Sequence, residues 1–243
     1  MEAQLFLGSR LQGENPSTRL IWLLGERTGD CAERSGRERV GRLRGCVNKL
    51  DSVDSVGDTG RARLGEKGTV LHILFVCTGN ICRSPTAERL ASAYAQQRGF
   101  EGLEASSAGI QAVIGSPMHP TAALVLAGLG GDASNFAARQ LTPRIASSAD
   151  LILTMTAAHR DAVLERNPAL LRRTFSMSEV AWLITQGGAS AFDDLSRLRP
   201  RVRRGDLWDV ADPIGRDMDV FSRVGGQIAE LVPGIVDLCE RSS

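Results

Sequence analysis

The chain has 243 residues and is almost neutral, with 29 lysines and arginines against 28 aspartates and glutamates. This balance gives no electrostatic basis for binding nucleic acid or an acidic membrane surface. Hydrophobic residues make up 42% of the chain, which is typical of a soluble globular protein. The five cysteines are odd in number and irregularly spaced, which favours a reducing cytoplasm. No cluster of histidines and cysteines indicates a metal site, and we expect neither a metal nor another cofactor.

Residues 1–69 differ in composition from the rest of the chain. Glycine, arginine and serine are spread through them, and no apolar period persists. Such a segment buries too little surface to offset the entropy of ordering it, so we predict a low-complexity, largely disordered extension with a short helix near Leu20–Gly25. We find neither a signal-peptide pattern nor an apolar run long enough to cross a bilayer. We therefore expect a cytoplasmic protein without membrane insertion and one functional domain at residues 70–243.

The stretch from Val70 to Leu90 carries the strongest pattern in the sequence. Its apolar run, Leu71–Val76, shows no alternation and predicts a strand that is buried on both faces within a parallel sheet. Cys77 ends the run. Gly79 and Asn80 then tolerate unusual backbone angles, so the chain can curl tightly after the strand.

A helix is predicted directly after this loop. Ser84 is a favourable N-cap, Pro85 suits the first helical position, and Glu88 suits the first turn. Apolar residues then recur at helical spacing, and we expect the helix to end near Gly99.

A short loop between a strand and a helix can bind an anion. Its backbone N–H groups and the positive end of the helix dipole favour negative charge, and Arg83 can hold two phosphate oxygens with its planar guanidinium. The same field lowers the pKa of a thiol, to roughly 3.5–7.5 at helix N-termini, so Cys77 is a candidate nucleophile. The Ser84 hydroxyl can donate to its sulfur. Cys82, five positions on, either forms a reversible disulfide with Cys77 under oxidation or packs the loop.

A plainer reading of the same residues is a small buried cysteine followed by an arginine at a chance spacing. The ordered combination of strand, glycine, asparagine, arginine, serine-proline and helix disfavours it.

The sequence CTGNICRSP at residues 77–85 resembles the phosphate-binding loop of low molecular weight protein tyrosine phosphatases. The resemblance extends to near the C-terminus and implies an α/β fold, a flavodoxin-like three-layer sandwich with a four-stranded parallel sheet. It also implies a protein tyrosine phosphatase whose catalytic residues are Cys77, Arg83 and Asp212. The loop residues expected to bind the substrate are Thr78, Gly79, Asn80, Ile81, Cys82 and Ser84.

The remaining elements alternate between strands and helices. By composition, Gly187–Asp206 reads as a loop, and its arginines between Arg197 and Arg204 fit a solvated insert better than a surface that captures anionic substrates. Strands are expected at Leu103–Ser107, Leu151–Met155 and Arg172–Ser176, with Ala138–Gln140 as a further strand or its approach. Helices are expected from Pro117–Pro120 to Gly128, at Pro143–Ser148, Thr156–Asn167 and Glu179–Thr185, and from Val220 towards the C-terminus.

Asp212 is followed by a proline, and an Asp-Pro pair alone is usually only a turn. The resemblance assigns the general acid to Asp212, with Asp209 as its nearby rival. In the implied mechanism, the Cys77 thiolate attacks phosphorus while Asp212 protonates the leaving oxygen, and water then hydrolyses the cysteinyl-phosphate. The loop amides and Arg83 supply positive charge, so we expect no metal requirement.

One departure from the family pattern concerns the support of the loop. Relatives often carry a histidine that braces the loop asparagine, and Phe136 stands at that position here. Asn80 then needs another brace, for which Ser107 is the candidate.

A second departure concerns substrate contacts. Gln111–Ile114 and Ile214 lack the aromatic rings that many relatives place beside phosphotyrosine, and Trp208 reads more readily as a core residue than as a replacement. The sequence SAGIQAVIG resembles the bacterial branch that acts on tyrosine kinases of polysaccharide assembly. Such a kinase is therefore the expected tyrosine-phosphorylated partner.

Three other functions stay open at this point. A protein-arginine phosphatase shares the loop but tends to carry threonine at the position of Ile81, where a bulkier apolar residue favours tyrosine. A thiol-dependent arsenate reductase needs further redox cysteines downstream, and Cys239 alone follows the loop. A phosphate-binding interaction module without catalysis is disfavoured by the joint presence of Cys77, Arg83 and Asp212. No role is assigned to the histidines, which are His72, His119 and His159.

Overall fold

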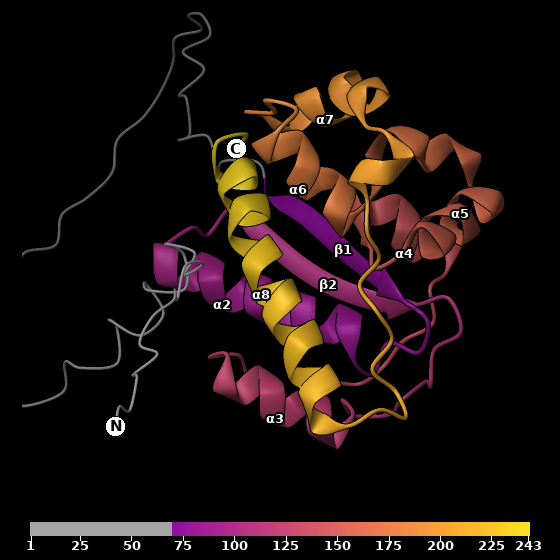
Figure 1. Cartoon of the computed structure of the whole chain (residues 1–243), viewed down its shortest axis with the longest axis vertical. Helices are drawn as coiled ribbons and strands as arrows, with labels where there is room; N and C mark the ends of the chain where they lie inside the picture. Colours follow the sequence, from indigo (N-terminus) through magenta and orange to yellow (C-terminus); the bar gives the residue numbers. More distant parts are fainter. Residues whose placement is uncertain (1–69) are drawn as a thin grey trace, which may run out of the picture. The chain divides into compact units, whose positions relative to one another are not determined.

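The computed structural model describes residues 70–243, which alternate between strands and helices (Figure 1). The extension and the short helix predicted within residues 1–69 lie outside the described residues. The strands are β1 (Leu71–Cys77), β2 (Leu103–Gly109), β3 (Leu151–Thr154) and β4 (Thr174–Ser176). The helices are α2 (Arg83–Arg98), α3 (Pro120–Gly128), α4 (Pro143–Ser148), α5 (Ala157–Arg166), α6 (Met177–Thr185), α7 (Phe192–Leu198) and α8 (Met218–Glu240). Three short 3-10 segments are η1 (Pro168–Arg173), η2 (Arg199–Arg201) and η3 (Arg204–Asp206).

The four strands form one parallel sheet in the order β2-β1-β3-β4. At the end of β1, Cys77 pairs with Gly109 of β2, and Val76 pairs with Thr154 of β3. Because parallel strands end at the same edge, the loops that follow β1, β2 and β3 meet there, which is where ligands bind in open parallel sheets. The predicted four-stranded parallel sheet is confirmed.

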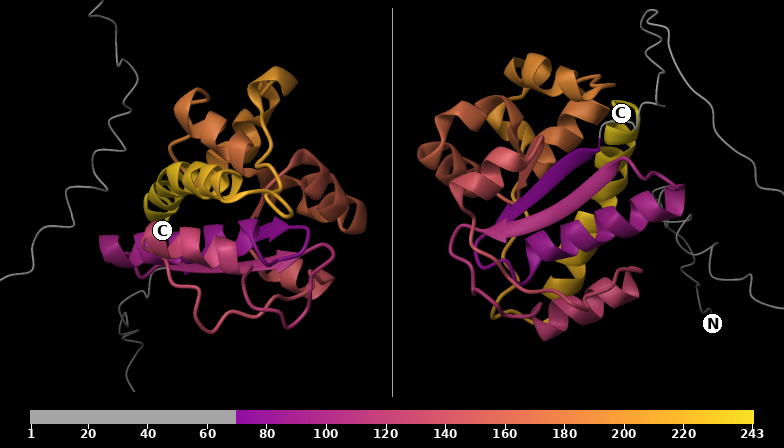
Figure 2. Two further views of the ribbon diagram at one scale, coloured as in Figure 1. Left: turned by 60° about the horizontal axis from the view of Figure 1, so that its bottom comes forward. Right: turned by 180° about the vertical axis from the view of Figure 1, so that it is seen from behind.

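Helices cover both faces of this sheet, which confirms the predicted three layers (Figures 1 and 2). Alternate residues of β1 face opposite sides, as a strand requires. Ile73 and Phe75 pack with α2, α3, α6 and α8, whereas Leu74 and Val76 pack with α4 and α5. All four side chains are fully buried. The unbroken apolar run in the sequence therefore reflects burial on both faces.

The start of α2 differs from the prediction. The helix begins at Arg83, its N-cap is Cys82, and no side chain caps it. Ser84 lies inside the helix, and its hydroxyl contacts Cys77 Sγ at 2.9 Å instead of capping a backbone N–H group. The predicted cap at Ser84 was therefore wrong. The predicted end is confirmed, since Gly99 closes the helix in the left-handed conformation with φ of 68°.

The segment predicted as a loop at 187–206 is instead largely helical, with α7, η2 and η3 following one another. The side chain of Asp194 accepts from the N–H groups of Ser190 and Ala191 and so caps the start of α7. Leu195 and Leu198 lie one helical turn apart and are both buried. The charged composition concealed this short amphipathic helix.

One arginine in that segment, Arg199, binds residues of the core. Arg199 donates to both carboxylate oxygens of Glu179, at 2.7 and 3.1 Å, and its guanidinium carbon lies 4.1 Å from the centre of the Phe175 ring. It also donates to the backbone carbonyl of Thr174 in β4. The prediction of a solvated insert is wrong for Arg199, while Arg197 is exposed and pairs with Asp194.

Smaller differences concern the ends of elements. The last strand, β4, starts two residues later than predicted because Pro168–Arg173 forms the 3-10 segment η1. The stretch 138–140 forms no strand and contributes one bridge, between Gly109 and Gln140. The other helices lie where the sequence predicts them, with ends within a few residues. Within residues 70–243, none of the helices has the length and apolar character needed to cross a membrane.

We predict that Arg199→Ala lowers the free energy of unfolding by about 2–4 kcal/mol, because the substitution removes the close partner of a buried carboxylate. Glu179 would keep the backbone N–H of Ser176, at 3.3 Å, and the longer contact to Arg160, at 3.6 Å. Urea denaturation measures the change. Arg203→Ala, at an exposed position, is the matched control and should stay within about 0.5 kcal/mol of wild type. Equal, small effects of both substitutions would contradict the anchoring role of Arg199.

Candidate active site

The loop that joins β1 to α2 lies at the carboxyl edge of the sheet. It turns at Asn80, which has φ of 55°, in the left-handed region. Gly79 does not have a positive φ, so only one of the two residues expected to take unusual angles does so. A side chain at Gly79 would meet Ile81 and Val113 at 3.6 Å, an ordinary contact distance.

The carbonyl groups of this loop are bonded away from its centre. Cys77, Thr78 and Gly79 accept from the backbone of residues 110–113, Ile81 accepts from His119, and Cys82 accepts from Thr86, at 2.7 to 3.1 Å. Within residues 70–243, the backbone N–H groups of Thr78 to Arg83 have no protein acceptor. Such a run of free donors at a helix N-terminus is the arrangement with which proteins bind anions.

Cys77 is buried at the base of this loop. Its sulfur lies 2.9 Å from Ser84 Oγ, and Ser84 Oγ in turn accepts from Asn80 Nδ2 at 3.0 Å. Because the serine oxygen already accepts from the amide, its hydrogen is free to point at the sulfur. Ser84 is therefore placed to donate to Cys77, as the sequence predicts.

The predicted brace on Asn80 is confirmed. Asn80 Nδ2 donates to Ser107 Oγ at 2.8 Å, and Asn80 Oδ1 accepts from the N–H of Arg139 at 2.8 Å. Ser107 donates onward to Glu88 at 2.5 Å. Burial raises the pKa of Glu88, although the bond from Ser107 opposes this shift. Phe136 takes no part in this network and lies against Arg89 instead.

Arg83 and Asp212 meet at the mouth of the loop from distant parts of the chain. Arg83 Nη2 donates to Asp212 Oδ2 at 2.5 Å, and Arg83 Nη1 donates to the carbonyl of Val210 at 3.1 Å. The guanidinium is buried, whereas about half of the Asp212 side chain is exposed. A buried cation thus lies beside a carboxyl group that solvent and ligands can reach.

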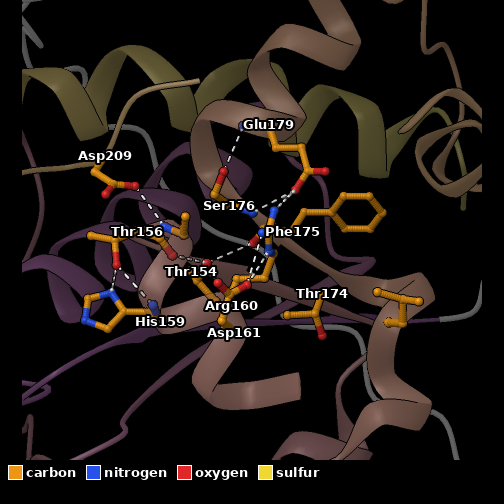
Figure 3. Close-up of polar contacts among 12 residues, drawn as sticks. Thr154, Thr156, His159, Arg160, Asp161, Thr174, Phe175, Ser176, Glu179 and Asp209 are labelled. Atoms are coloured by element: carbon orange, nitrogen blue, oxygen red, sulfur yellow. Dashed lines mark hydrogen bonds and ion pairs between the residues drawn. The ribbon is translucent and has the colours of Figure 1, made fainter. Parts of the chain in front are cut away.

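Asp209, the rival acid, has a different role in the structure. Its Oδ1 accepts from the N–H of Ala157 at 2.8 Å, in the first turn of α5 (Figure 3). This bond fastens the segment that leads to Asp212. Trp208 is 41% exposed, so the interpretation of it as a core residue was wrong. Val113, Ile114 and Ile214 are exposed, so at these three positions the protein presents aliphatic rather than aromatic side chains.

His159 is the site residue that sequence reasoning missed. It is 5% exposed, with Nε2 lying 2.9 Å from Thr78 Oγ1 and Nδ1 lying 2.9 Å from Thr156 Oγ1. Burial, followed by the charge of Arg83, lowers its pKa to about 4. Its contact with Thr78 spans 81 residues, and no local pattern indicates it.

Cys82 is also buried, and burial, followed by the proximity of Cys77, raises the pKa of its thiol to about 12. It is a protonated thiol, and its reversible disulfide with Cys77 stays a prediction. Within residues 70–243, no three histidine, cysteine or acidic side chains are arranged to hold a metal ion.

Comparison with known proteins bears on this geometry. The family model described as low molecular weight phosphotyrosine protein phosphatase matches residues 72–179. A probable low molecular weight protein-tyrosine-phosphatase, EpsP of Ralstonia nicotianae, is 42% identical over 149 residues, which cover 61% of this chain and 82% of that protein. A protein-arginine-phosphatase of Geobacillus stearothermophilus is 29% identical over 165 residues, which cover 68% and 93%. The crystal structure of the tyrosine phosphatase AmsI of Erwinia amylovora matches with a TM-score of 0.53 and 29% identity, over 71% of this chain and 95% of that one.

The buried, neutral His159 makes stability depend on pH. The unfolded histidine binds a proton near pH 6.5, whereas the folded one stays neutral down to about pH 4. Unfolding therefore takes up a proton between these values, and this contribution to stability is complete above pH 6.5 and falls as the pH falls. We expect His159→Asn to lose less in melting temperature than wild type between about pH 7.5 and 5. Parallel melting curves at all pH values would contradict a neutral His159.

Proposed function

The chain belongs to the low molecular weight phosphotyrosine protein phosphatase family, and we propose that it hydrolyses phosphotyrosine in proteins through a cysteinyl-phosphate intermediate. One observation carries the proposal most directly. Cys77 lies under a run of free N–H groups, bonded to Ser84, with Arg83 and Asp212 paired at the same loop. This arrangement supports a sulfur nucleophile, a site for an anion, and an acid within one small region.

In the first step, the Cys77 thiolate attacks phosphorus in line with the leaving phenolic oxygen. The loop amides and the Arg83 guanidinium stabilise the equatorial oxygens, which carry the developing charge. Asp212 begins this step protonated and donates its proton to the leaving oxygen. Its partial exposure lets the substrate approach, and the phosphoryl oxygens then replace the Asp212 carboxyl group as the partner of Arg83.

In the second step, water attacks the cysteinyl-phosphate and the sulfur leaves as a thiolate. Asp212, now a carboxylate, takes the proton from that water. Ser84 donates its hydrogen bond to the sulfur and so stabilises the charge that returns to Cys77. The Asn80 amide keeps the Ser84 hydroxyl turned towards the sulfur during both steps.

A protein-arginine phosphatase is the second candidate, because a relative with that name matches most of the domain. Ile81 favours tyrosine over arginine. Together with Val113 it forms an aliphatic wall beside Gly79, and this wall offers no hydrogen-bond partner to a charged guanidino group.

The remaining alternatives receive less support. Cys239 lies fully buried in α8, and burial raises its pKa to about 12, so it is a poor redox partner for an arsenate reductase. A silent binding module has no need of an exposed carboxyl group beside Arg83. For the partner, the resemblance to the bacterial branch supports a tyrosine kinase of polysaccharide assembly in the cytoplasm.

The identity of the substrate is tested with matched peptides that carry phosphotyrosine, phosphoarginine or phosphoserine. We expect kcat/KM for phosphotyrosine to exceed the others by about 10²-fold or more. Ile81→Thr should narrow the gap to phosphoarginine, because it replaces an apolar wall with a hydrogen-bonding group. A wild-type preference for phosphoarginine would favour the second candidate instead.

The covalent mechanism is tested at the two residues that bind the phosphoryl group. Cys77→Ser should abolish turnover of an aryl phosphate and still bind inorganic phosphate, because the loop amides and Arg83 remain. Arg83→Ala should lose both, since it removes the buried cation. Calorimetry with phosphate and a chromogenic assay measure the two properties. Near-normal turnover by Cys77→Ser would rule out a cysteinyl-phosphate.

An isosteric pair separates the two aspartates. Asp212→Asn removes the proton donor and should lower kcat by about 10²–10³-fold. Asp209→Asn keeps an oxygen that can accept from Ala157 N–H, so we expect nearly full activity. In the pH profile of kcat/KM, the decline towards higher pH that reflects loss of the acid's proton should disappear only in Asp212→Asn. The reverse ranking of these two variants would assign the acid to Asp209.

A further inference from the structure

His159 takes no part in the proposed chemistry, yet it is buried beside the loop that carries Cys77. Its ring joins two hydroxyls, with Nε2 at 2.9 Å from Thr78 Oγ1 and Nδ1 at 2.9 Å from Thr156 Oγ1. Thr78 directly follows the nucleophile, and Thr156 is the N-cap of α5. The imidazole therefore connects the first turn of α5 to the first residue of the anion-binding loop.

The hydrogen-bond partners of the His159 ring indicate which of its two nitrogens carries the proton. Thr156 Oγ1 accepts from the backbone N–H of His159 at 3.1 Å, as an N-cap does. Its own hydrogen is then free to point at Nδ1, and we infer that Nδ1 is the acceptor, because this gives every hydrogen of the group a partner. Nε2 consequently carries the proton and donates to Thr78 Oγ1. Figure 3 shows the ring turned back onto Thr156 at the start of the helix.

The same turn of α5 holds the segment that carries the proposed acid. The N–H of Ala157 donates to Asp209 (Figure 3), and the N–H of Val210 donates to the carbonyl of Met155 at 2.8 Å. The carbonyl of Val210 in turn accepts from Arg83. The start of α5 is thus bonded to the nucleophile loop on one side and to the acid segment on the other.

We propose that His159 is a positioning residue of the phosphatase that acts through Thr78. By donating from Nε2 to the Thr78 hydroxyl, it holds the loop of Cys77 at a fixed distance from the segment of Asp212. This inference rests on the proposed function, because the spacing of nucleophile and acid matters only for a reaction that uses both.

The ring must stay neutral for this role, since a proton on Nδ1 would replace its acceptor with a second donor. The charged groups that face it are Arg83 on α2 and, before α8, Asp209 and Asp212. Burial and Arg83 outweigh the two aspartates and keep its pKa at about 4. The acceptor at Nδ1, which holds the ring against Thr156, is therefore present throughout the neutral range.

Two amide substitutions distinguish positioning from simple packing. The amide nitrogen of His159→Gln can reach the place of Nε2 and donate to Thr78, whereas His159→Asn is too short and reaches only Thr156. With an aryl phosphate, we expect kcat to fall roughly tenfold or more in His159→Asn and less than about threefold in His159→Gln. Equal losses in both variants would overturn the proposal.

Variants of Thr78, the partner of His159, and of His72, a histidine elsewhere on the sheet, test whether the effect is specific. Thr78→Val should match the loss in His159→Asn, and the double variant should lose no more than either single one, because both remove the same bond. Thr78→Ser keeps the hydroxyl and should therefore lose less of kcat than Thr78→Val. His72 also bonds a serine hydroxyl, at 2.6 Å, but at the far end of β1, so His72→Asn should leave kcat unchanged. Additive losses in the double variant would contradict action through Thr78.

Two readouts do not depend on turnover and separate this inference from the proposed function. Nitrogen NMR of histidine-labelled protein should show the proton of His159 on Nε2 at neutral pH, and a proton on Nδ1 would overturn the assignment. The affinity for inorganic phosphate should fall in parallel in His159→Asn and Thr78→Val but not in His159→Gln. If the variants show this pattern of phosphate affinity but the wild-type protein hydrolyses no aryl phosphate, the proposed function is refuted and the role of His159 in shaping the loop is not.

Discussion

The site depends on where the carbonyl groups of one short loop are bonded. A loop of five residues between a strand and a helix has as many acceptors as donors, and an anion fits only if the acceptors face elsewhere. Here the segment after β2 supplies the N–H groups of Ile110, Gln111 and Val113, which bind the loop carbonyls and leave the loop N–H groups free. The proposed anion site is therefore made by two loops, although only one carries the characteristic residues.

This pairing of loops imposes a strict demand at the end of β2. A Cβ atom at Gly109 would lie 2.5 Å from the carbonyl oxygen of Thr78, which no side chain can tolerate. Glycine at this position lets the two backbones approach until their hydrogen bonds form. Asn80 then fixes the curl of the loop through Ser107 and the N–H of Arg139, so the geometry is set before any ligand binds. Such preorganisation is what makes electrostatic stabilisation effective in catalysis.

Features of the fold and the site could be predicted when they depend on residues close together in the sequence, and were harder to predict when they depend on residues far apart. The strand that ends at Cys77 and the end of α2 at Gly99 follow from local patterns, and the sequence predicts both correctly. The brace from Ser107 was also predictable, because the residue expected to brace Asn80 was visibly replaced by Phe136.

The features that sequence reasoning missed are contacts between residues far apart in the chain, made by residue types that commonly play more than one structural role. A serine before a proline predicts a helix cap, but Ser84 is instead engaged by the sulfur of Cys77. An arginine in a charged run predicts a solvated side chain, but Arg199 binds Glu179 and covers Phe175. His159 reaches Thr78 only after the sheet has brought β1 and β3 side by side. None of these contacts leaves a periodic signal in the sequence.

A crystal structure with vanadate, which mimics phosphorus with five ligands, tests the central claim most directly. We expect vanadium bonded to Cys77 Sγ, with its equatorial oxygens accepting from the N–H groups of Thr78 to Arg83 and from the Arg83 guanidinium. The apical oxygen should lie within hydrogen-bond reach of Asp212. Vanadate bound away from the sulfur, or loop N–H groups already bonded to other parts of the protein, would contradict it.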